Sequence, residues 1–257
     1  MPEAEALLVA SDVHKIYRNG AETVALRGVN LTIRRRDFVA LVGQSGSGKT
    51  TLLNLLGALD QATSGSISLD GRDYGRLSDD ELAELRRQRI GFVFQFHYLL
   101  NEFTVLENAL MPLIVGRGTP LREGRDYVLS LLDRVGMTPL LHKPATQLSG
   151  GQAQRVAVVR ALVNKPSLIL ADEPTGNLDT DNGRQVFEIM RELNRDVGSA
   201  FVLVTHDDRL ACQTDRLVRI QDGGIVQDVP TSELPNFECQ APAGQCPFQV
   251  MPESAKS

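Results

Sequence analysis

The sequence lacks any hydrophobic run that approaches the roughly 18–20 residues needed to cross a lipid bilayer. It also lacks an excess of basic residues: its formal net charge is −5, which disfavours a protein that coats nucleic acid. The first residues, Met1-Pro2-Glu3-Ala4-Glu5, are acidic where a signal peptide is basic. We therefore expect no transmembrane segment, no signal peptide and no nucleic-acid partner.

Cysteine is also scarce. The three residues Cys212, Cys239 and Cys246 make an odd number and form no metal-ligand grouping. We interpret them as reduced thiols of a cytoplasmic protein, although Cys239 and Cys246 could pair if that segment were oxidised. With 22 Gly and 12 Pro in 257 residues the composition does not indicate disorder, and a hydrophobic content of 42% is enough for a sizeable core.

The residues from Gly43 to Thr50 match the phosphate-binding pattern G-x-x-x-x-G-K-[ST]. An apolar run at 38–42 predicts a buried strand before them, and a leucine-rich helix is expected at 51–56. A strand, a glycine loop and a helix in this order point backbone N–H groups at a phosphate chain. Lys49 would contact the β- and γ-phosphates, and the Thr50 hydroxyl would bind Mg²⁺. The residues expected at the nucleotide are Gly43, Ser45, Gly46, Ser47, Gly48, Lys49, Thr50 and Thr51.

A second apolar run, residues 168–172, predicts a strand that ends in two carboxylates. Such a strand would bring Asp172 to the Mg²⁺ of the phosphate-binding loop. Glu173 would then orient and deprotonate the attacking water. The sequence therefore predicts hydrolysis of a nucleoside triphosphate.

Two more polar side chains follow predicted buried strands. Gln95 closes the strand expected at 90–94, where a glutamine is often an ordinary strand-end residue. His206 follows the strand expected at 200–204, at the edge where open α/β sheets bind ligands.

Two further stretches leave alternatives open. Tyr17, near the end of a strand expected at 7–17, could stack on an adenine ring or be a half-buried strand aromatic, and the residues alone favour the second. Leu148-Ser149-Gly150-Gly151-Gln152 precedes a helix predicted at 153–163. It could form a second anion-binding nest or a plain N-cap.

These pieces together resemble the nucleotide-binding subunit of ABC transporters over residues 5–228, and the match at 148–152 is the specific part. The resemblance implies an α/β fold: a RecA-like P-loop NTPase core with an antiparallel β subdomain and a helical insertion. Its expected divisions are a core at about 1–95 and 154–229, a helical subdomain at about 96–153, and a loosely ordered tail at 230–257. It also implies a head-to-tail homodimer that closes over two ATP molecules.

The resemblance assigns roles to single residues. Tyr17 would stack on adenine, and Gln95 would sense the γ-phosphate and its Mg²⁺. Asp179 would communicate across the dimer, and His206 would contact the γ-phosphate. The residues that would reach the ATP held by the opposite subunit are Ser149, Gly150, Gly151 and Gln152.

A narrower resemblance is to the lipoprotein-releasing (Lol) ATPases, carried by residues 91–100, 103–112, 174–179 and 193–195. The macrolide-export and cell-division ATPases share most of the last two segments. The resemblance implies a peripheral subunit at the cytoplasmic face of the bacterial inner membrane. There it would drive a separate membrane permease that releases lipoproteins. The alternative is the ATPase of a macrolide-export or cell-division (signalling) complex.

Overall fold

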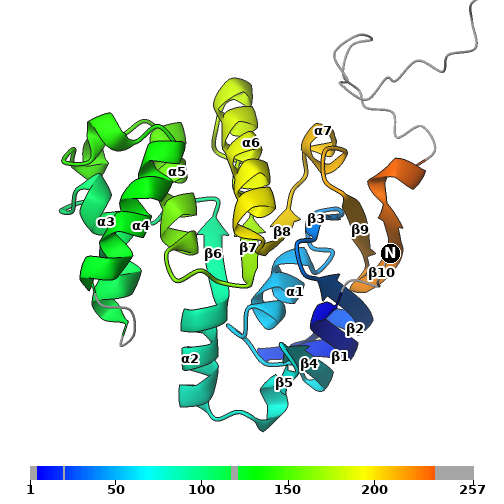
Figure 1. The fold of residues 1–257 in the computed structure, drawn as a ribbon. Coiled ribbons are helices and arrows are strands. Elements are labelled where there is room, and N and C mark those ends of the chain that lie inside the picture. Colours follow the sequence, from blue (N-terminus) through cyan, green and yellow to red (C-terminus); the bar gives the residue numbers. More distant parts are fainter. Residues whose placement is uncertain (1–4, 20, 117–120, 235–257) are drawn as a thin grey trace, which may run out of the picture.

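The computed structural model describes residues 5–19, 21–116 and 121–234, which form two β-sheets with helices packed around them (Figure 1). The strands are β1 (Ala6–Asn19), β2 (Ala21–Arg34), β3 (Phe38–Val42), β4 (Ser64–Leu69), β5 (Arg72–Asp73), β6 (Ile90–Phe94), β7 (Leu168–Asp172), β8 (Ala200–Val204), β9 (Arg216–Gln221) and β10 (Gly224–Pro230). One sheet has the order β10-β9-β3-β8-β7-β6 and is parallel except for the β9–β10 pair. The other is antiparallel with the order β2-β1-β4-β5.

The helices are α1 (Lys49–Leu56), α2 (Asp79–Arg89), α3 (Val105–Val115), α4 (Leu121–Arg134), α5 (Gly150–Leu162), α6 (Thr180–Val197) and α7 (Asp208–Ala211), with short 3₁₀ turns at Tyr74–Arg76, Thr138–Leu140, Ala145–Gln147 and Thr231–Glu233. The leucines of α1 join residues of both sheets in one buried cluster, so α1 lies between the sheets. The opposite face of the parallel sheet is covered by α5 and α6. Helices α3 and α4 pack beside α5, and these three helices form one end of the molecule (Figure 1).

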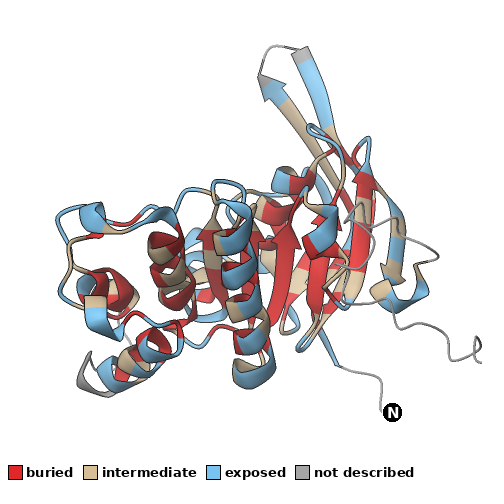
Figure 2. Ribbon diagram, turned by 90° about the horizontal axis from the view of Figure 1, so that it is seen from above, coloured by how far each residue is buried: buried red, intermediate tan, exposed pale blue. Residues whose placement is uncertain are grey.

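The expected strands are confirmed, and their burial explains their sequence. Every residue of β3 and of β8 is buried, because a parallel sheet has both faces covered and its strands are apolar throughout. Figure 2 shows this central sheet as a continuous buried layer, with the β1–β2 hairpin projecting away from it and exposed near its tip. Capping boxes at Ser78 and Thr104 begin α2 and α3.

The predicted start of α5 is wrong. The helix expected to begin at Ala153 begins at Gly150, because Ser149 is its N-cap and the two glycines form its first turn. The Ser149 hydroxyl accepts a hydrogen bond from the Gln152 amide, and the Gln152 side chain accepts one from the Ser149 amide. Ser149 is therefore the N-cap of α5.

Glycines bring the phosphate-binding loop against its neighbours. A Cβ atom on Gly43, where φ is 154°, would lie 2.2 Å from the carbonyl oxygen of Ile220 in β9. A Cβ atom on Gly48, where φ is 106°, would lie 2.7 Å from the carbonyl oxygen of Ala25 in β2. The loop is thus framed by both sheets, and larger side chains are excluded there.

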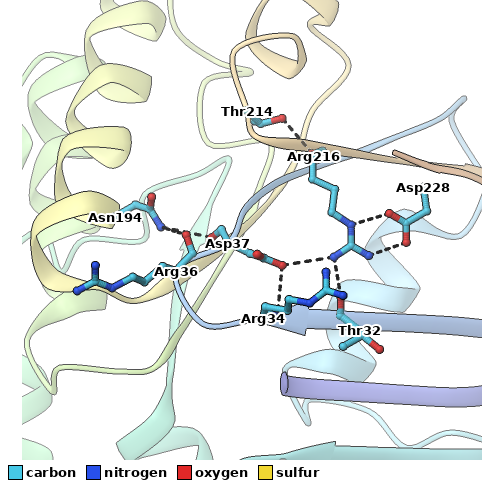
Figure 3. A network of polar contacts seen from close by, with 8 residues as sticks. All are labelled: Thr32, Arg34, Arg36, Asp37, Asn194, Thr214, Arg216 and Asp228. Atoms are coloured by element: carbon cyan, nitrogen blue, oxygen red, sulfur yellow. Dashed lines mark hydrogen bonds and ion pairs between the residues drawn. The ribbon is translucent and has the colours of Figure 1, made fainter. Parts of the chain in front are cut away.

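A network of polar contacts joins the two sheets around Arg216 in β9 (Figure 3). Its guanidinium donates to both carboxylate oxygens of Asp228 in β10, at 2.6 Å each. It also donates to the backbone oxygen of Thr32 in β2 at 2.7 Å, and to Asp37 at 3.3 Å. These contacts raise the pKa of Arg216, chiefly through the hydrogen bond with Asp228, so the charge is held firmly in a half-buried position.

The chain remains ordered a little beyond residue 229. Thr231 donates its amide to the backbone oxygen of Asp215 at 3.0 Å, and Leu234 packs against a small buried cluster beside β3 and β9. The remainder of the predicted tail, with Cys239 and Cys246, lies outside the described residues. The predicted subdomain division at residue 153 falls inside α5, which runs across it without a break. No helix among the described residues is long and apolar enough to span a membrane.

Candidate functional site

The phosphate-binding loop presents donors around one small space. The Lys49 ammonium donates to the backbone oxygens of Gly43 at 2.9 Å and Gln44 at 2.8 Å. Helix α1 begins at Gly48 in a left-handed conformation without a side-chain cap, so its first amides are left for another acceptor. The buried hydroxyl of Ser47 has no hydrogen-bond partner and lies close to Gly43. Free amides, a hydroxyl and a cation together suit an anion such as a phosphate chain.

Asp172 meets the phosphate-binding loop from the end of β7. Burial raises the pKa of its carboxyl and the Glu173 charge raises it further, while the Thr50 hydroxyl, which donates a hydrogen bond to it, and the Lys49 ammonium act in the opposite sense. A carboxylate that is costly to keep charged is well matched to a cation. In the described part of the chain, no group of three His, Cys, Asp or Glu side chains could hold a metal, so the Thr50 hydroxyl would have to contribute. This donor set of hydroxyl and carboxylate oxygens fits Mg²⁺.

Glu173 and His206 are adjacent, with 3.3 Å between the Glu173 Oε2 atom and His206 Nδ1. Glu173 has a φ of 45°, a conformation that a side chain other than glycine seldom adopts and that is often found at functional sites. Two thirds of the His206 side chain (67%) and 28% of the Glu173 side chain are exposed, so both remain accessible.

Gln95 reaches the same place through a residue that the sequence did not single out. Its amide donates to Asn177 Oδ1 at 3.1 Å, and Asn177 donates back to the Gln95 backbone oxygen at 3.3 Å. A Cβ atom on Gly176 would lie within about 3.2 Å of both the Gln95 amide and the Glu173 carboxylate, so the two side chains converge over this glycine. The structure therefore brings Gln95, Glu173 and His206 together.

The residues 149–152 belong to a different neighbourhood. Gly150 packs against Leu178, and Gly151 lies so close to Asn182 that a Cβ atom would be 2.7 Å from its side-chain oxygen. Asp179 is the N-cap of α6 and accepts a hydrogen bond from the same Asn182. Among the described residues we find no hydrogen bond between 149–152 and the phosphate-binding loop. Within one chain, Asp179 therefore lies with residues 149–152 and not with Lys49.

Tyr17 lies beside α1. Its hydroxyl donates to Asp60 at 2.9 Å and forms a further hydrogen bond with Thr51. The Lys15 ammonium lies over its ring, 4.8 Å from the centroid. Lys15 and Asp60 were not indicated by any sequence pattern, because they are separated by 45 residues.

An exposed aromatic surface follows Gln95. The side chains of Phe96 and Tyr98 are 60% and 64% exposed, and their ring centroids are 6.4 Å apart. Arg160 of α5 fixes the backbone of this segment by donating hydrogen bonds to the backbone oxygens of His97 and Tyr98, at 2.6 and 2.7 Å. The segment is fixed by its backbone, which leaves the rings free to contact another molecule.

Comparisons with known proteins agree with this arrangement. A family model described as ABC transporter matches residues 26–176. The lipoprotein-releasing system ATP-binding protein LolD 1 of Rhodopseudomonas palustris is 52% identical over 221 residues, which are 85% of this chain and 98% of that protein. The lipoprotein-releasing system ATP-binding protein LolD of Anaeromyxobacter dehalogenans is 50% identical over 230 residues, which are 89% of this chain and 96% of that protein.

Among solved structures, a dimeric ATP-binding cassette in a post-hydrolysis state, bound to ADP and Pi, is similar with a TM-score of 0.79 and 39% identity. The match covers 88% of this chain and 99% of that chain. The predicted fold class is thereby confirmed. The family model spans the phosphate-binding loop, residues 149–152 and Asp172, whereas Asp179 and His206 lie beyond its last matched residue.

Proposed function

This chain belongs to the ABC transporter family and is an ATPase, and on that premise we propose that its ATP hydrolysis drives the release of lipoproteins from a bacterial inner membrane. The observation that carries the cargo assignment is the 52% and 50% identity to lipoprotein-releasing ATPases over nearly their whole length. The work on lipoproteins would be done by a separate membrane permease. The chain would then lie at the cytoplasmic face of that membrane as a peripheral subunit.

In this proposal the phosphate-binding loop holds ATP. Lys49 exchanges its two backbone acceptors for the β- and γ-phosphates, and the uncapped amides of α1 donate to phosphate oxygens. Thr50 and Asp172, with Gln95, would hold Mg²⁺, which supplies positive charge against the phosphates. The raised pKa of Asp172 supports this assignment, since a bound cation would relieve the cost of its charge.

Glu173 acts as the general base in this mechanism. Its carboxylate orients the attacking water and takes its proton, and the φ of 45° aims the side chain away from the line of β7. His206, 3.3 Å from that carboxylate, contacts the γ-phosphate and keeps Glu173 in place. Gln95, held by Asn177, couples the state of the γ-phosphate to the aromatic surface that follows it.

The complete site requires two copies of the chain. The exposure of Ser149 and Gly150 supports a role at the ATP of an opposite subunit, and Gly150 lies against Leu178 of its own chain. Gly151, Gln152 and Asp179 would belong to the same contact. The similarity to a dimeric cassette with ADP and Pi bound agrees with this head-to-tail pairing.

The permease would dock on the exposed aromatic surface of Phe96 and Tyr98. Tyr98→Ala is expected to remove permease-dependent stimulation of ATP hydrolysis and to spare ATP binding, because neither ring belongs to the proposed ATP site. Val226→Ala, a second exposed apolar residue far along the chain in β10, is the matched control and should leave stimulation unchanged.

Depletion of the protein in its own bacterium tests the cargo. Outer-membrane lipoproteins should accumulate in the inner membrane, and they should be recovered there by membrane fractionation. Normal lipoprotein sorting after depletion would overturn the cargo assignment and leave the ATPase assignment in place.

A further inference from the structure

We infer that Lys15 and Asp60 are positioning residues that hold the Tyr17 ring as a one-sided platform for the adenine base. The inference rests on the ATP site proposed above and on the stacking of Tyr17 on adenine that the family resemblance implies. It goes beyond both, since it assigns a role to two residues that touch no nucleotide themselves. It follows from how the three side chains are connected.

Asp60 accepts hydrogen bonds from two side chains. One carboxylate oxygen accepts from the Lys15 ammonium at 2.6 Å, and the other accepts from the Tyr17 hydroxyl at 2.9 Å. Lys15 also donates to the backbone oxygen of Gln61 at 2.8 Å. The hydroxyl end of the Tyr17 ring is therefore tied to the segment that follows α1.

Lys15 covers one face of the Tyr17 ring. The side chains of Lys15 and Tyr17 both reach the carboxylate of Asp60, so they lie on the same side of β1. The ammonium lies 4.8 Å from the ring centroid in a cation–π contact. Only the opposite face of the ring remains available for a flat base.

Helix α1 links the Tyr17 ring to the phosphate-binding loop. Thr51 in the first turn of α1 forms a hydrogen bond with Tyr17, and Asp60 follows α1 by a few residues. The same short helix therefore carries the phosphate-binding Lys49 at its start and, through Thr51, a contact that fixes the Tyr17 ring. A base and a triphosphate joined by a ribose need this fixed separation, and pre-organised contacts lower the cost of binding.

The charges support a fixed ring at neutral pH. Burial alone would raise the pKa of Asp60, but hydrogen bonds from Lys15, Gln61 and Tyr17 outweigh it and lower the pKa. Burial and the hydrogen bond with Asp60 raise the pKa of Tyr17, so its hydroxyl remains a donor. The Lys15 side chain is only 11% exposed, which leaves it little freedom to leave the ring.

Two probes separate base binding from phosphate binding. Magnesium ADP carries both groups, whereas magnesium pyrophosphate has no base, and calorimetry gives the Kd of each for the full chain. For Lys15→Met and Asp60→Asn we expect ADP to bind about 5–10-fold more weakly, part of the stacking free energy of one base. Pyrophosphate binding should change less than about 2-fold, which also shows that each variant is folded. In steady-state hydrolysis KM for ATP should rise with kcat nearly unchanged.

The chain offers a matched control. Lys165 lies over the ring of Tyr127 at the same 4.8 Å, away from the nucleotide site, so Lys165→Met removes an equivalent contact and should leave the Kd of ADP unchanged. Lys15→Arg keeps a cation over the ring and should recover most of the lost affinity. Tyr17→Phe keeps the ring but loses the bond to Asp60, and should resemble Asp60→Asn.

Tyr17→Ala distinguishes the two hypotheses. If it leaves ADP binding intact, the proposed base site itself is wrong. If it weakens ADP binding while Lys15→Met and Asp60→Asn do not, the base site stands and the positioning role is overturned. Equal losses for ADP and pyrophosphate in those two variants would show a purely structural role and would also overturn the inference.

Discussion

At the end of β7, the carboxyl of Asp172 lies beside Glu173 and is partly buried, and both influences raise its pKa above 3.8. The folded protein therefore holds this proton more tightly than the unfolded chain does. It follows that the free energy of unfolding falls as the pH rises through the range above 3.8. The carboxylate proposed to hold Mg²⁺ therefore destabilises the folded protein when it is charged.

Asp172→Asn should separate these two effects. The amide keeps the size of the side chain and removes its charge, so we expect the nucleotide-free protein at neutral pH to gain about 0.5–2 kcal/mol, the range usual for relieving such a site. Scanning calorimetry should show a higher unfolding temperature at pH 7 and a smaller difference near pH 4, while Mg²⁺-dependent hydrolysis is lost. An equal gain at both pH values would contradict the electrostatic explanation.

Glu173→Gln tests the general base. The amide cannot accept the proton of water, and loss of general-base catalysis typically costs about 10²–10⁴-fold in rate. Lys49, Thr50 and Asp172 are unchanged, so ATP should still bind and should hold two chains together. Size-exclusion chromatography with Mg-ATP should show a shift from monomer to dimer, and adding Ser149→Arg should reverse it. Tight ATP binding by a variant that stays monomeric at high concentration would count against the two-chain site.

At the scale of elements, α5 connects two regions that the proposed mechanism must link. It begins with Ser149 and Gly150 at the expected dimer contact, and its Arg160 donates to the backbone under Phe96 and Tyr98. A displacement of α5 would therefore reach the aromatic surface directly. In the proposed mechanism this helix would link the dimer contact to the surface on which the permease docks.

We predict that Arg160→Met weakens this connection. Basal hydrolysis should persist, whereas stimulation by the reconstituted permease should fall several-fold because the aromatic segment is no longer held. Arg155→Met is the matched control on the same helix: its guanidinium donates to Val135 and Gln185 instead. Each variant should lose about 1–3 kcal/mol of stability through unpaired backbone oxygens. If both variants lost stimulation to a similar extent, the lower stability of α5 alone would explain the effect.

The sequence predicted the strands well and the first turns of helices poorly. The helices expected to begin at Thr51 and Ala153 begin two and three residues earlier, at Lys49 and Gly150. Apolar periodicity starts only where a helix meets the core, and the polar or glycine residues after an N-cap carry no such signal. Both of these first turns contain candidate site residues, so the residues missed at the helix starts are ones proposed to contact nucleotide.

The positions of the candidate site residues at strand ends could be predicted, but their partners could not. Asp172, Glu173 and Gln95 each follow a buried strand, a local pattern that a sequence can show. The bond between Gln95 and Asn177 joins residues 82 positions apart, and that between Lys15 and Asp60 joins residues 45 apart. Such pairs depend on the order of strands in the sheets, which periodicity does not specify.

At the scale of the whole molecule, Arg216 joins the parallel sheet to the antiparallel one (Figure 3). We predict that Arg216→Met lowers the free energy of unfolding by about 3–5 kcal/mol, since it leaves Asp228 and Asp37 without their half-buried cation. Urea unfolding followed by circular dichroism measures this. Arg134→Met, whose partners Glu192 and Asp196 are exposed, should cost less than about 1 kcal/mol. Similar losses in both variants would mean that the junction is not specially important.

The order of strands in the parallel sheet has a consequence for biosynthesis. Strand β3 leads into the phosphate-binding loop, but its two neighbours, β8 and β9, leave the ribosome after another hundred and more residues. At about 5–20 residues per second, the loop of a nascent chain waits on the order of 10–40 seconds for β9. Gly43 meets its neighbour Ile220 only then. Cellular ATP can therefore stabilise the finished subunit but not the growing one, and the leucines of α1 need protection during that interval.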